Sequence, residues 1–294
     1  MQHSALKSDF LLVLVTLLAA TSWVFSREAL AGMAPLQFIG GRFLCAGLIL
    51  GAFGYSALKQ LPGESWLRAL MTGVVMGVAM CLWIMGLYHS DNMGIGAFIT
   101  SLSVVFVPIV GRLFFATRTA LSTWVAMAIA LVGLACLRLE GGFALSVSDL
   151  FFLAAALMLS LHFNLNSRYA VRIASLPLTA IQLSMTGLVA LAMSALLEAE
   201  AVNLNSSLLG WLIASIVIGT CLRFFLQVKA QGMASASHAA VIMTLEPVWA
   251  SLIGVLLYAE RMTGLQLIGC CLIFSALLVS RWRFLLRRPA RNPC

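Results

Sequence analysis

The stretch TLEPVWASLIGVLLYAER, residues 244–261, is the part of the sequence from which the fold can be inferred. It belongs to an apolar run that begins near Ala234 and is long enough to span a bilayer. The carboxylate of Glu246 lies about halfway along this run, next to Pro247. An ionisable group at that depth is costly and indicates function, and a proline removes a backbone donor and loosens the preceding turn. The stretch therefore predicts a membrane helix that is kinked around a polar site.

An earlier stretch, SLSVVFVPIVGRLFFATR at residues 101–118, runs parallel to the first at a constant offset. Gly111 corresponds to Gly254, but Ser103 stands where the later copy has Glu246, so the charge is present in only one copy. Weak self-similarity of this kind is typical of the internal repeats of transporters.

The composition predicts an integral membrane protein. Of the 294 residues, 62% are hydrophobic and 10% are charged, whereas soluble domains carry about 25% charged residues. Ten apolar windows of about 20 residues fit, with no room for a separate soluble domain. The expected spans are residues 8–26, 34–56, 67–88, 93–115, 119–138, 149–168, 178–198, 208–229, 234–258 and 263–283. The expected fold class is an all-α integral membrane protein with ten transmembrane helices.

These spans divide near Gly141 into two units, residues 1–142 and 143–294, of five spans each. A duplicated unit with an odd number of spans enters the membrane from opposite sides, so the two repeats are expected to be inverted relative to each other. In an alternative interpretation, Lys7 and the apolar run after it form a cleaved signal peptide, which would leave nine helices and break the repeat.

The basic residues predict the orientation, because Lys and Arg accumulate in cytoplasmic segments. One set of segments carries 13 of the 18 basic residues: Lys7, Lys59, Arg68, Arg112, Arg118, Arg168, Arg172, Lys229, Arg281, Arg283, Arg287, Arg288 and Arg291. The opposite set carries three: Arg27, Arg138 and Arg261. Both termini are therefore expected in the cytoplasm, in a multi-pass protein of the cytoplasmic (inner) membrane.

Partners follow from the same composition. The formal net charge of +8 indicates lipid headgroups as a partner before nucleic acid. The seven cysteines are scattered without CxxC or zinc-finger spacing, and the four histidines lie on separate segments, so we expect no metal and no cofactor. No GxxxxGK loop of an ATP-driven motor is present in the sequence.

The motifs resemble the drug/metabolite transporter superfamily, in particular permeases of the EamA type. The resemblance covers almost the whole chain and is carried by Trp23, Arg42-Phe43, Glu246-Pro247, Glu260, Thr263, Gly269, Leu272 and Ile273. The sequence departs from the family pattern at Val24, Thr117, Gln182 and Ser184. These departures affect the assignment of a substrate more than the assignment of the fold.

The resemblance implies two inverted five-helix repeats around a central cavity, and alternating access for small metabolites, often outward. We expect an exporter of amino acids or related compounds and not an enzyme, with protons as a candidate coupling ion. The fold does not fix the cargo. The glycine pairs Gly47-x-x-x-Gly51 and Gly73-x-x-x-Gly77 favour packing within a monomer over dimerisation, so a monomer or weak dimer is expected.

Two charged residues have competing interpretations. Glu246 either binds a cationic group or a proton, or serves as a structural carboxylate that caps a broken helix or pairs with an arginine. Arg223 lies near the cytoplasmic end of its span, where it either snorkels to the headgroups, pairs with Glu246 or contacts substrate.

The remaining candidate substrate-binding residues are polar or aromatic groups inside the spans. Arg42 either binds a substrate carboxylate or ties neighbouring helices together through backbone carbonyls, and the second, which is the more common role of such an arginine, is favoured. His162 and Asn166 share one helix face, which indicates either the cavity wall or hydrogen bonds between helices. The other candidates are Trp23, Trp83, Thr100, Ser103 and Trp249.

Two other classes of protein are alternatives to a transporter. An intramembrane enzyme acting on lipid-linked substrates would need clustered carboxylates or a histidine–acid pair at one interface, whereas the sequence places one carboxylate deep in a span. An accessory membrane subunit is the other alternative.

Overall fold

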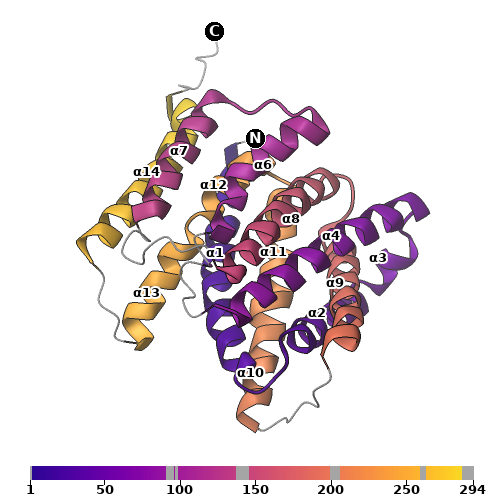
Figure 1. Ribbon diagram of the computed structural model, residues 1–294. Helices are drawn as coiled ribbons and strands as arrows, with labels where there is room; N and C mark the ends of the chain where they lie inside the picture. Colours follow the sequence, from indigo (N-terminus) through magenta and orange to yellow (C-terminus); the bar gives the residue numbers. More distant parts are fainter. Residues whose placement is uncertain are drawn as a thin grey trace.

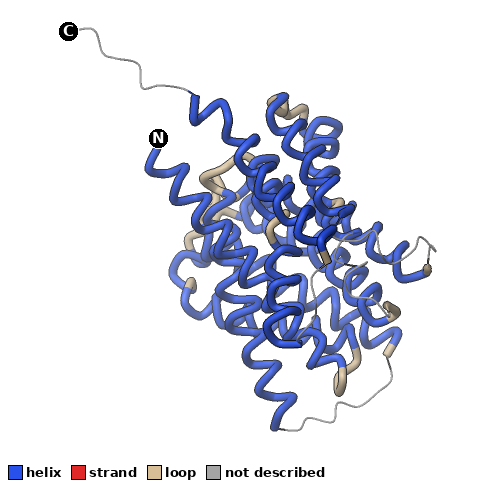
Figure 2. Tube along the Cα trace, turned by 90° about the vertical axis from the view of Figure 1, so that its left-hand side faces the viewer, coloured by secondary structure: helices blue, strands red, loops and turns tan. Residues whose placement is uncertain are grey.

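The computed structural model describes residues 2–90, 96, 99–136, 146–198, 206–258 and 263–286, and every regular element among them is helical (Figure 2). The first half contains α1 (Gln2–Leu30), α2 (Pro35–Phe53), the short α3 (Tyr55–Lys59), α4 (Gly63–Tyr88), α6 (Ser103–Phe115) and α7 (Leu121–Cys136). The second half contains α8 (Val147–Tyr169), α9 (Ser175–Leu197), α10 (Ser206–Ile216), the π-helix η2 (Val217–Leu222), α11 (Arg223–Gln231), α12 (Ala236–Met243), α13 (Glu246–Tyr258) and α14 (Gly264–Leu286).

Seven of the described helices are long and apolar enough to cross a membrane. Three further windows hold shorter apolar helices, Ile99–Phe115, Leu121–Cys136 and Leu267–Ala276. The prediction of an all-α membrane protein is thus confirmed, and the count of ten spans stays a prediction. The expected boundary between the repeats, near Gly141, lies outside the described residues.

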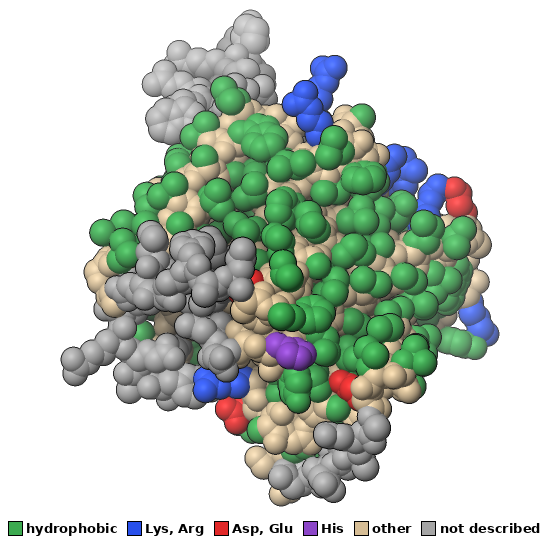
Figure 3. All heavy atoms as spheres, in the orientation of Figure 1, with side chains coloured by type: hydrophobic (Ala, Val, Ile, Leu, Met, Phe, Trp, Pro, Cys, Tyr) green, Lys and Arg blue, Asp and Glu red, His purple; other side chains and the backbone are tan. Residues whose placement is uncertain are grey.

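The outer surface matches a lipid environment. Figure 3 shows a face covered mostly by apolar side chains, with the few Lys and Arg side chains at its margins. Large apolar residues such as Phe53, Leu113 and Leu196 leave most of their surface exposed. Hydrocarbon chains solvate such residues without the cost that water would impose.

The most extensive contact between two helices joins α2 of the first half to α9 of the second. A Cβ atom on Gly47 would clash with the backbone nitrogen of Ser184, and one on Gly187 would clash with the backbone nitrogen of Leu44. These contacts are reciprocal, because Gly47 and Gly187 are 140 positions apart and so are Leu44 and Ser184. Small residues therefore let two equivalent helices approach closely about a local pseudo-twofold axis.

Other helix contacts have the same symmetry. Helix α7 packs along α14 at one side of the bundle, and α2, α4 and α9 lie together at the other (Figure 1). Helix α1 contacts α13, and in the same way α8, the counterpart of α1, contacts α6, the counterpart of α13. The start of α1 and the end of α14 lie at the same end of the molecule (Figures 1 and 2).

Two helices are broken at equivalent points, and both breaks lie next to polar residues. Leu102 forms a turn before α6, which begins at Ser103, and Thr244 and Leu245 form a turn before α13, which begins at Glu246. Ser103 and Glu246 are separated by the same 143 positions as the two sequence stretches. The expected kink at Glu246-Pro247 is therefore present as a break in the helix.

The eighth expected span has a different irregularity that the sequence did not predict. Helices α10 and α11 are joined by the π-helix η2, in which the Thr220 hydroxyl donates to the Ser215 carbonyl five residues back, at 2.8 Å. A π-helical turn widens the helix, frees carbonyl oxygens and is frequent at functional sites. Here it lies directly before Arg223.

Candidate functional site

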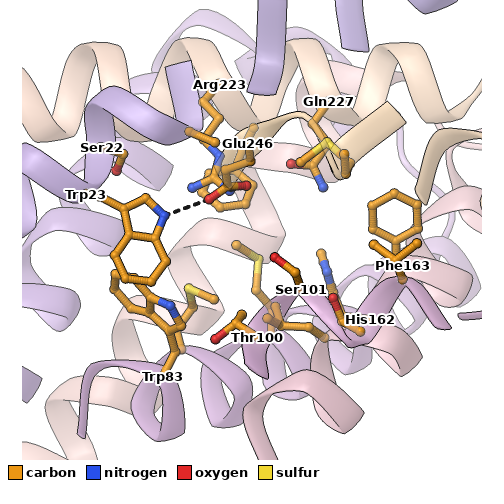
Figure 4. Close-up of a pocket in the computed structure, with 18 of the residues that line it drawn as sticks. Ser22, Trp23, Trp83, Thr100, Ser101, His162, Phe163, Arg223, Gln227 and Glu246 are labelled. Atoms are coloured by element: carbon orange, nitrogen blue, oxygen red, sulfur yellow. Dashed lines mark hydrogen bonds and ion pairs between the residues drawn. The ribbon is translucent and has the colours of Figure 1, made fainter. Parts of the chain in front are cut away.

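A cavity of about 130 Å³ lies where the two broken helices meet the centres of α1, α2, α4, α8 and α11 (Figure 4). The two halves contribute equivalent residues to its wall. From α1 come Ala19, Ser22 and Trp23, and from α8 come Leu159, His162 and Phe163, each 140 positions later. From the region of the first break come Thr100, Ser103, Val104 and Val107, and from the second come Met243, Glu246, Pro247 and Ala250, each 143 positions later.

Glu246 faces this cavity from the first turn of α13 and has two partners. Its Oε1 atom accepts a hydrogen bond from Trp23 Nε1 at 2.7 Å, and its Oε2 atom lies 3.7 Å from Arg223 Nη2. The Glu246 and Arg223 side chains are only 20% and 18% exposed. The carboxylate is thus held by one neutral donor and one cation, and of the three interpretations of Arg223 the ion pair is present.

The indoles of Trp23 and Trp83 form one wall of the cavity. Their ring centroids are 4.7 Å apart in an edge-to-face arrangement, and both side chains are buried. Edge-to-face pairing is a favourable geometry for two aromatic rings. Because Trp83 packs against Trp23, it also fixes the indole that donates to Glu246.

Arg42 lines the cavity, but neutral acceptors of two other helices take up its donors. Its Nε atom donates to Thr220 Oγ1 at 2.5 Å, and Nη1 donates to Ser26 Oγ at 3.1 Å. Nη2 donates to Ser22 Oγ at 2.6 Å and to the Gly219 carbonyl of the π-helix at 3.0 Å. The guanidinium therefore joins α1, α2 and η2, which is the helix-tying geometry that the sequence favoured.

A second buried network occupies the equivalent place in the other half. Gln182 stands 140 positions after Arg42; its Oε1 atom lies 3.2 Å from His162 Nε2, and its Nε2 atom donates to Asn166 Oδ1 at 2.8 Å. Asn166 in turn donates to Gln231. His162 reaches the cavity, whereas Asn166 lies behind it, completely buried between helices.

The structure brings together most of the residues that the sequence singled out. Glu246, Trp23, Trp83, Thr100, Ser103, His162 and Arg42 line the cavity. Asn166 and Trp249 do not, because Asn166 bonds to Gln182 and Gln231, and Trp249 Nε1 donates to Thr16 Oγ1 on α1 at 3.0 Å. Trp83 and Trp249 were both predicted to line the cavity because each lies deep in its span. The structure distinguishes them, because the Trp249 indole bonds to α1 and does not reach the cavity.

Gln227 is a cavity residue that the sequence interpretation missed. It lies one turn after Arg223 on α11 and is 5% exposed, and its Oε1 atom has no hydrogen-bond partner among the described residues. The signal was available, because Arg223 and Gln227 are spaced four apart and so share one helix face inside an apolar span.

A polytopic helical protein with a partly polar cavity between two broken helices has the architecture of a membrane transporter. The chain belongs to the EamA-like transporter family, whose model matches residues 6–139 and again residues 146–282.

The chain is 27% identical over 274 residues to a protein of Archaeoglobus fulgidus described as an uncharacterized transporter. The matched region covers 93% of this chain and 85% of that protein. A solved crystal structure is similar over 97% of this chain and 99% of that chain, with a TM-score of 0.78 and 17% sequence identity. At that identity the likeness concerns the fold alone.

Proposed function

We propose that this membrane transporter is a secondary transporter that exports amino acids or related small metabolites by alternating access. The observation that carries the proposal is the cavity at the junction of two helix breaks in equivalent positions of the two halves. Discontinuous helices of this kind supply exposed backbone groups and helix termini for substrate binding near the middle of the bilayer. The cavity is mostly apolar with a few polar side chains, as expected of a small-molecule site.

The proposed architecture is ten spans in two inverted repeats, residues 1–142 and 143–294. It is supported by the reciprocal contact of α2 with α9 and by the paired cavity residues 140 or 143 positions apart. In this arrangement the two halves rock about the cavity and expose it to one side of the cytoplasmic membrane at a time.

The proposed substrate-binding residues are Glu246, Trp23, Trp83, Thr100, Ser103 and His162, with Arg42 as their structural support. Trp249 and Asn166, also among the original candidates, would act only by holding α13 against α1 and α8 against α9 and α11. Protons remain a candidate coupling ion, and a pH gradient imposed across proteoliposomes tests that separately.

Counterflow in proteoliposomes tests the proposed function. Vesicles are loaded with each compound of a metabolite library, and uptake of the same radiolabelled compound is followed, with protein-free vesicles as the control. We expect accelerated exchange for at least one class of amino acids or related compounds. A chemically altered compound without exchange would instead support an intramembrane enzyme, and no exchange across the library would support an accessory subunit.

A further inference from the structure

Among the described residues, the charged side chains around the cavity do not balance. In the described part of its wall the charged side chains are Arg42, Arg223 and Glu246, which sum to one positive charge. Both arginines are protonated under all physiological conditions. Protonation of Glu246 or of His162, the remaining titratable side chain of the wall, would only add positive charge. An uncompensated charge inside a membrane protein is costly, so a bound anion would stabilise this cavity.

The two arginines differ in how many donors remain unused. Arg42 donates hydrogen bonds to Thr220, Ser26, Ser22 and the Gly219 carbonyl. The Nε atom of Arg223, by contrast, is buried and has no hydrogen-bond partner among the described residues.

The ion pair of Arg223 with Glu246 is also loose. Its 3.7 Å separation exceeds the range of about 2.7–2.9 Å of a charge-assisted hydrogen bond. The Glu246 carboxylate accepts the hydrogen bond from Trp23 through Oε1, whereas the oxygen nearest Arg223 is Oε2. A second carboxylate can therefore take the fork of Arg223 without leaving Glu246 unpaired.

Two neutral groups of the cavity wall also lack partners. Gln227 Oε1, one helical turn from Arg223, and Thr100 Oγ1 are both buried, line the cavity and have no hydrogen-bond partner among the described residues. Figure 4 shows Arg223, Glu246 and Gln227 on one side of the cavity and Thr100 on the opposite side. An amide oxygen accepts hydrogen bonds only. A ligand with a donor, such as a hydroxyl group, would therefore satisfy the Oε1 atom of Gln227.

We propose that the substrate is a small organic monoanion whose carboxylate binds Arg223 in competition with Glu246, and whose hydroxyl donates to Gln227. The proposal rests on the proposed function and narrows the proposed substrates to hydroxy acids, which carry no ammonium group. It also changes the proposed role of Glu246 from a ligand of the substrate to a competitor of the substrate for Arg223. A zwitterionic amino acid would leave the positive charge of the cavity uncompensated, and a cationic amine would face Arg223 without an anion of its own.

The size of the cavity selects the probes. Its volume of about 130 Å³ is close to that of an engineered cavity of about 150 Å³ that holds benzene, so a branched body of a few carbon atoms fits. Leucine, 2-hydroxy-4-methylpentanoate and 3-methylbutylamine share one such body and differ in charge. A fourth compound, 4-methylpentanoate, keeps the carboxylate and lacks the hydroxyl.

The experiment measures binding of these four compounds to the purified full-length protein in lipid nanodiscs, by calorimetry. We expect the hydroxy acid to bind at least about tenfold more tightly than leucine, and the amine to show no saturable binding. We expect 4-methylpentanoate to bind about fivefold more weakly than the hydroxy acid, and this difference to vanish in Gln227→Leu.

Three variants test the role of the arginine. Arg223→Gln is expected to weaken binding of the hydroxy acid at least about tenfold. Glu246→Gln is expected to strengthen it, because the competing carboxylate is removed. Lys59→Gln, an exposed change in α3, is the control and should alter nothing.

Equal or tighter binding of leucine, binding of the amine, or no binding of any of the four compounds would overturn the proposal. If Arg223→Gln does not fold, Glu246→Gln decides alone, and weaker binding of the hydroxy acid in that variant would contradict competition. Counterflow distinguishes the proposed substrate class from the proposed function. Exchange of leucine without exchange of the hydroxy acid would refute a monoanionic substrate and would still support a transporter.

Discussion

The carboxylate of Glu246 is held by a neutral donor, Trp23, and by a cation, Arg223, so a substitution there can separate hydrogen bonding from charge. We expect Glu246→Gln to lower the transport rate at least about tenfold while the protein stays folded. Glutamine keeps the shape and the bond to Trp23, but it cannot displace a bound anion from Arg223. The apparent KM for an anionic substrate should fall together with kcat, which initial rates of counterflow measure.

The double variant Glu246→Gln/Arg223→Gln distinguishes a functional pair from a structural one. If the ion pair serves stability, Glu246→Gln should lose thermal stability and the second change should restore part of it. If the charge serves transport, stability should hold and the double variant should stay inactive. Normal transport by a well-folded Glu246→Gln protein would remove the charge from the mechanism.

Arg42 allows a prediction about stability. Arg42→Lys keeps the charge but replaces a planar fork with a single ammonium group, which cannot reach Thr220, Ser26 and the Gly219 carbonyl together. We expect a loss of about 2 kcal/mol or more, seen as a lower midpoint of thermal unfolding. Arg68→Lys is the matched control, since Arg68 pairs with Glu64 in an exposed setting, where an ion pair contributes little. Equal midpoints for the two variants would contradict the role of Arg42.

At the scale of single residues, the sequence predicted which side chains lie at the cavity better than it predicted their contacts. Glu246 and Arg42 were identified because a charge inside an apolar span is rare. The bond between Trp23 and Glu246 joins residues 223 positions apart and depends on how α1 and α13 are rotated, which periodicity does not determine. Gln227 was missed because an uncharged side chain gives a weaker signal than an arginine.

At the scale of elements, the contact of α2 with α9 depends on glycine. Gly47→Ala would drive a Cβ atom into the Ser184 backbone, which cannot move aside without shifting α9. We expect a large loss of folded protein, measured as the monodisperse fraction in size-exclusion chromatography. Gly51→Ala is the control from the same motif, because its Cβ would meet only Leu58 Cδ1, at an ordinary 3.8 Å. That change should leave the fold intact or stabilise it slightly, since alanine favours helices. A similar loss in both variants would argue against the close approach.

The elements themselves were largely predictable. The expected spans 34–56 and 149–168 correspond to Pro35–Phe53 and Val147–Tyr169, because apolar length determines where a membrane helix can lie. The break at Glu246-Pro247 followed from proline chemistry. The π-helix η2 was not predicted, because two of its residues, Thr220 and Gly219, accept hydrogen bonds from Arg42 of another helix, and helical periodicity does not reveal such contacts.

At the scale of the whole molecule, the paired cavity residues extend the symmetry of the scaffold to the site, and the charges break it. Positions 103 and 246 are equivalent, yet one holds serine and the other glutamate, and positions 42 and 182 hold arginine and glutamine. Under the proposed alternating access, the scaffold would rock symmetrically, while the ion pair of Arg223 with Glu246 lies on one set of helices only. The constant offset between the two stretches was visible in the sequence, but the meeting of both stretches at one cavity needed the packing of α1 and α8.

The last prediction concerns topology, which a symmetric scaffold leaves open and the basic residues decide. With 13 basic residues in one set of segments and three in the other, we expect both termini in the cytoplasm and the segment near Gly141 outside. The start of α1 and the end of α14 lie at one end of the bundle, as a chain with an even number of crossings requires (Figures 1 and 2).

A single cysteine at position 141 or at position 59, in a variant without the seven native cysteines, should react differently with an impermeant maleimide. Position 141 should be labelled in intact cells, and position 59 only after lysis. The opposite pattern would contradict the predicted orientation and place both termini outside.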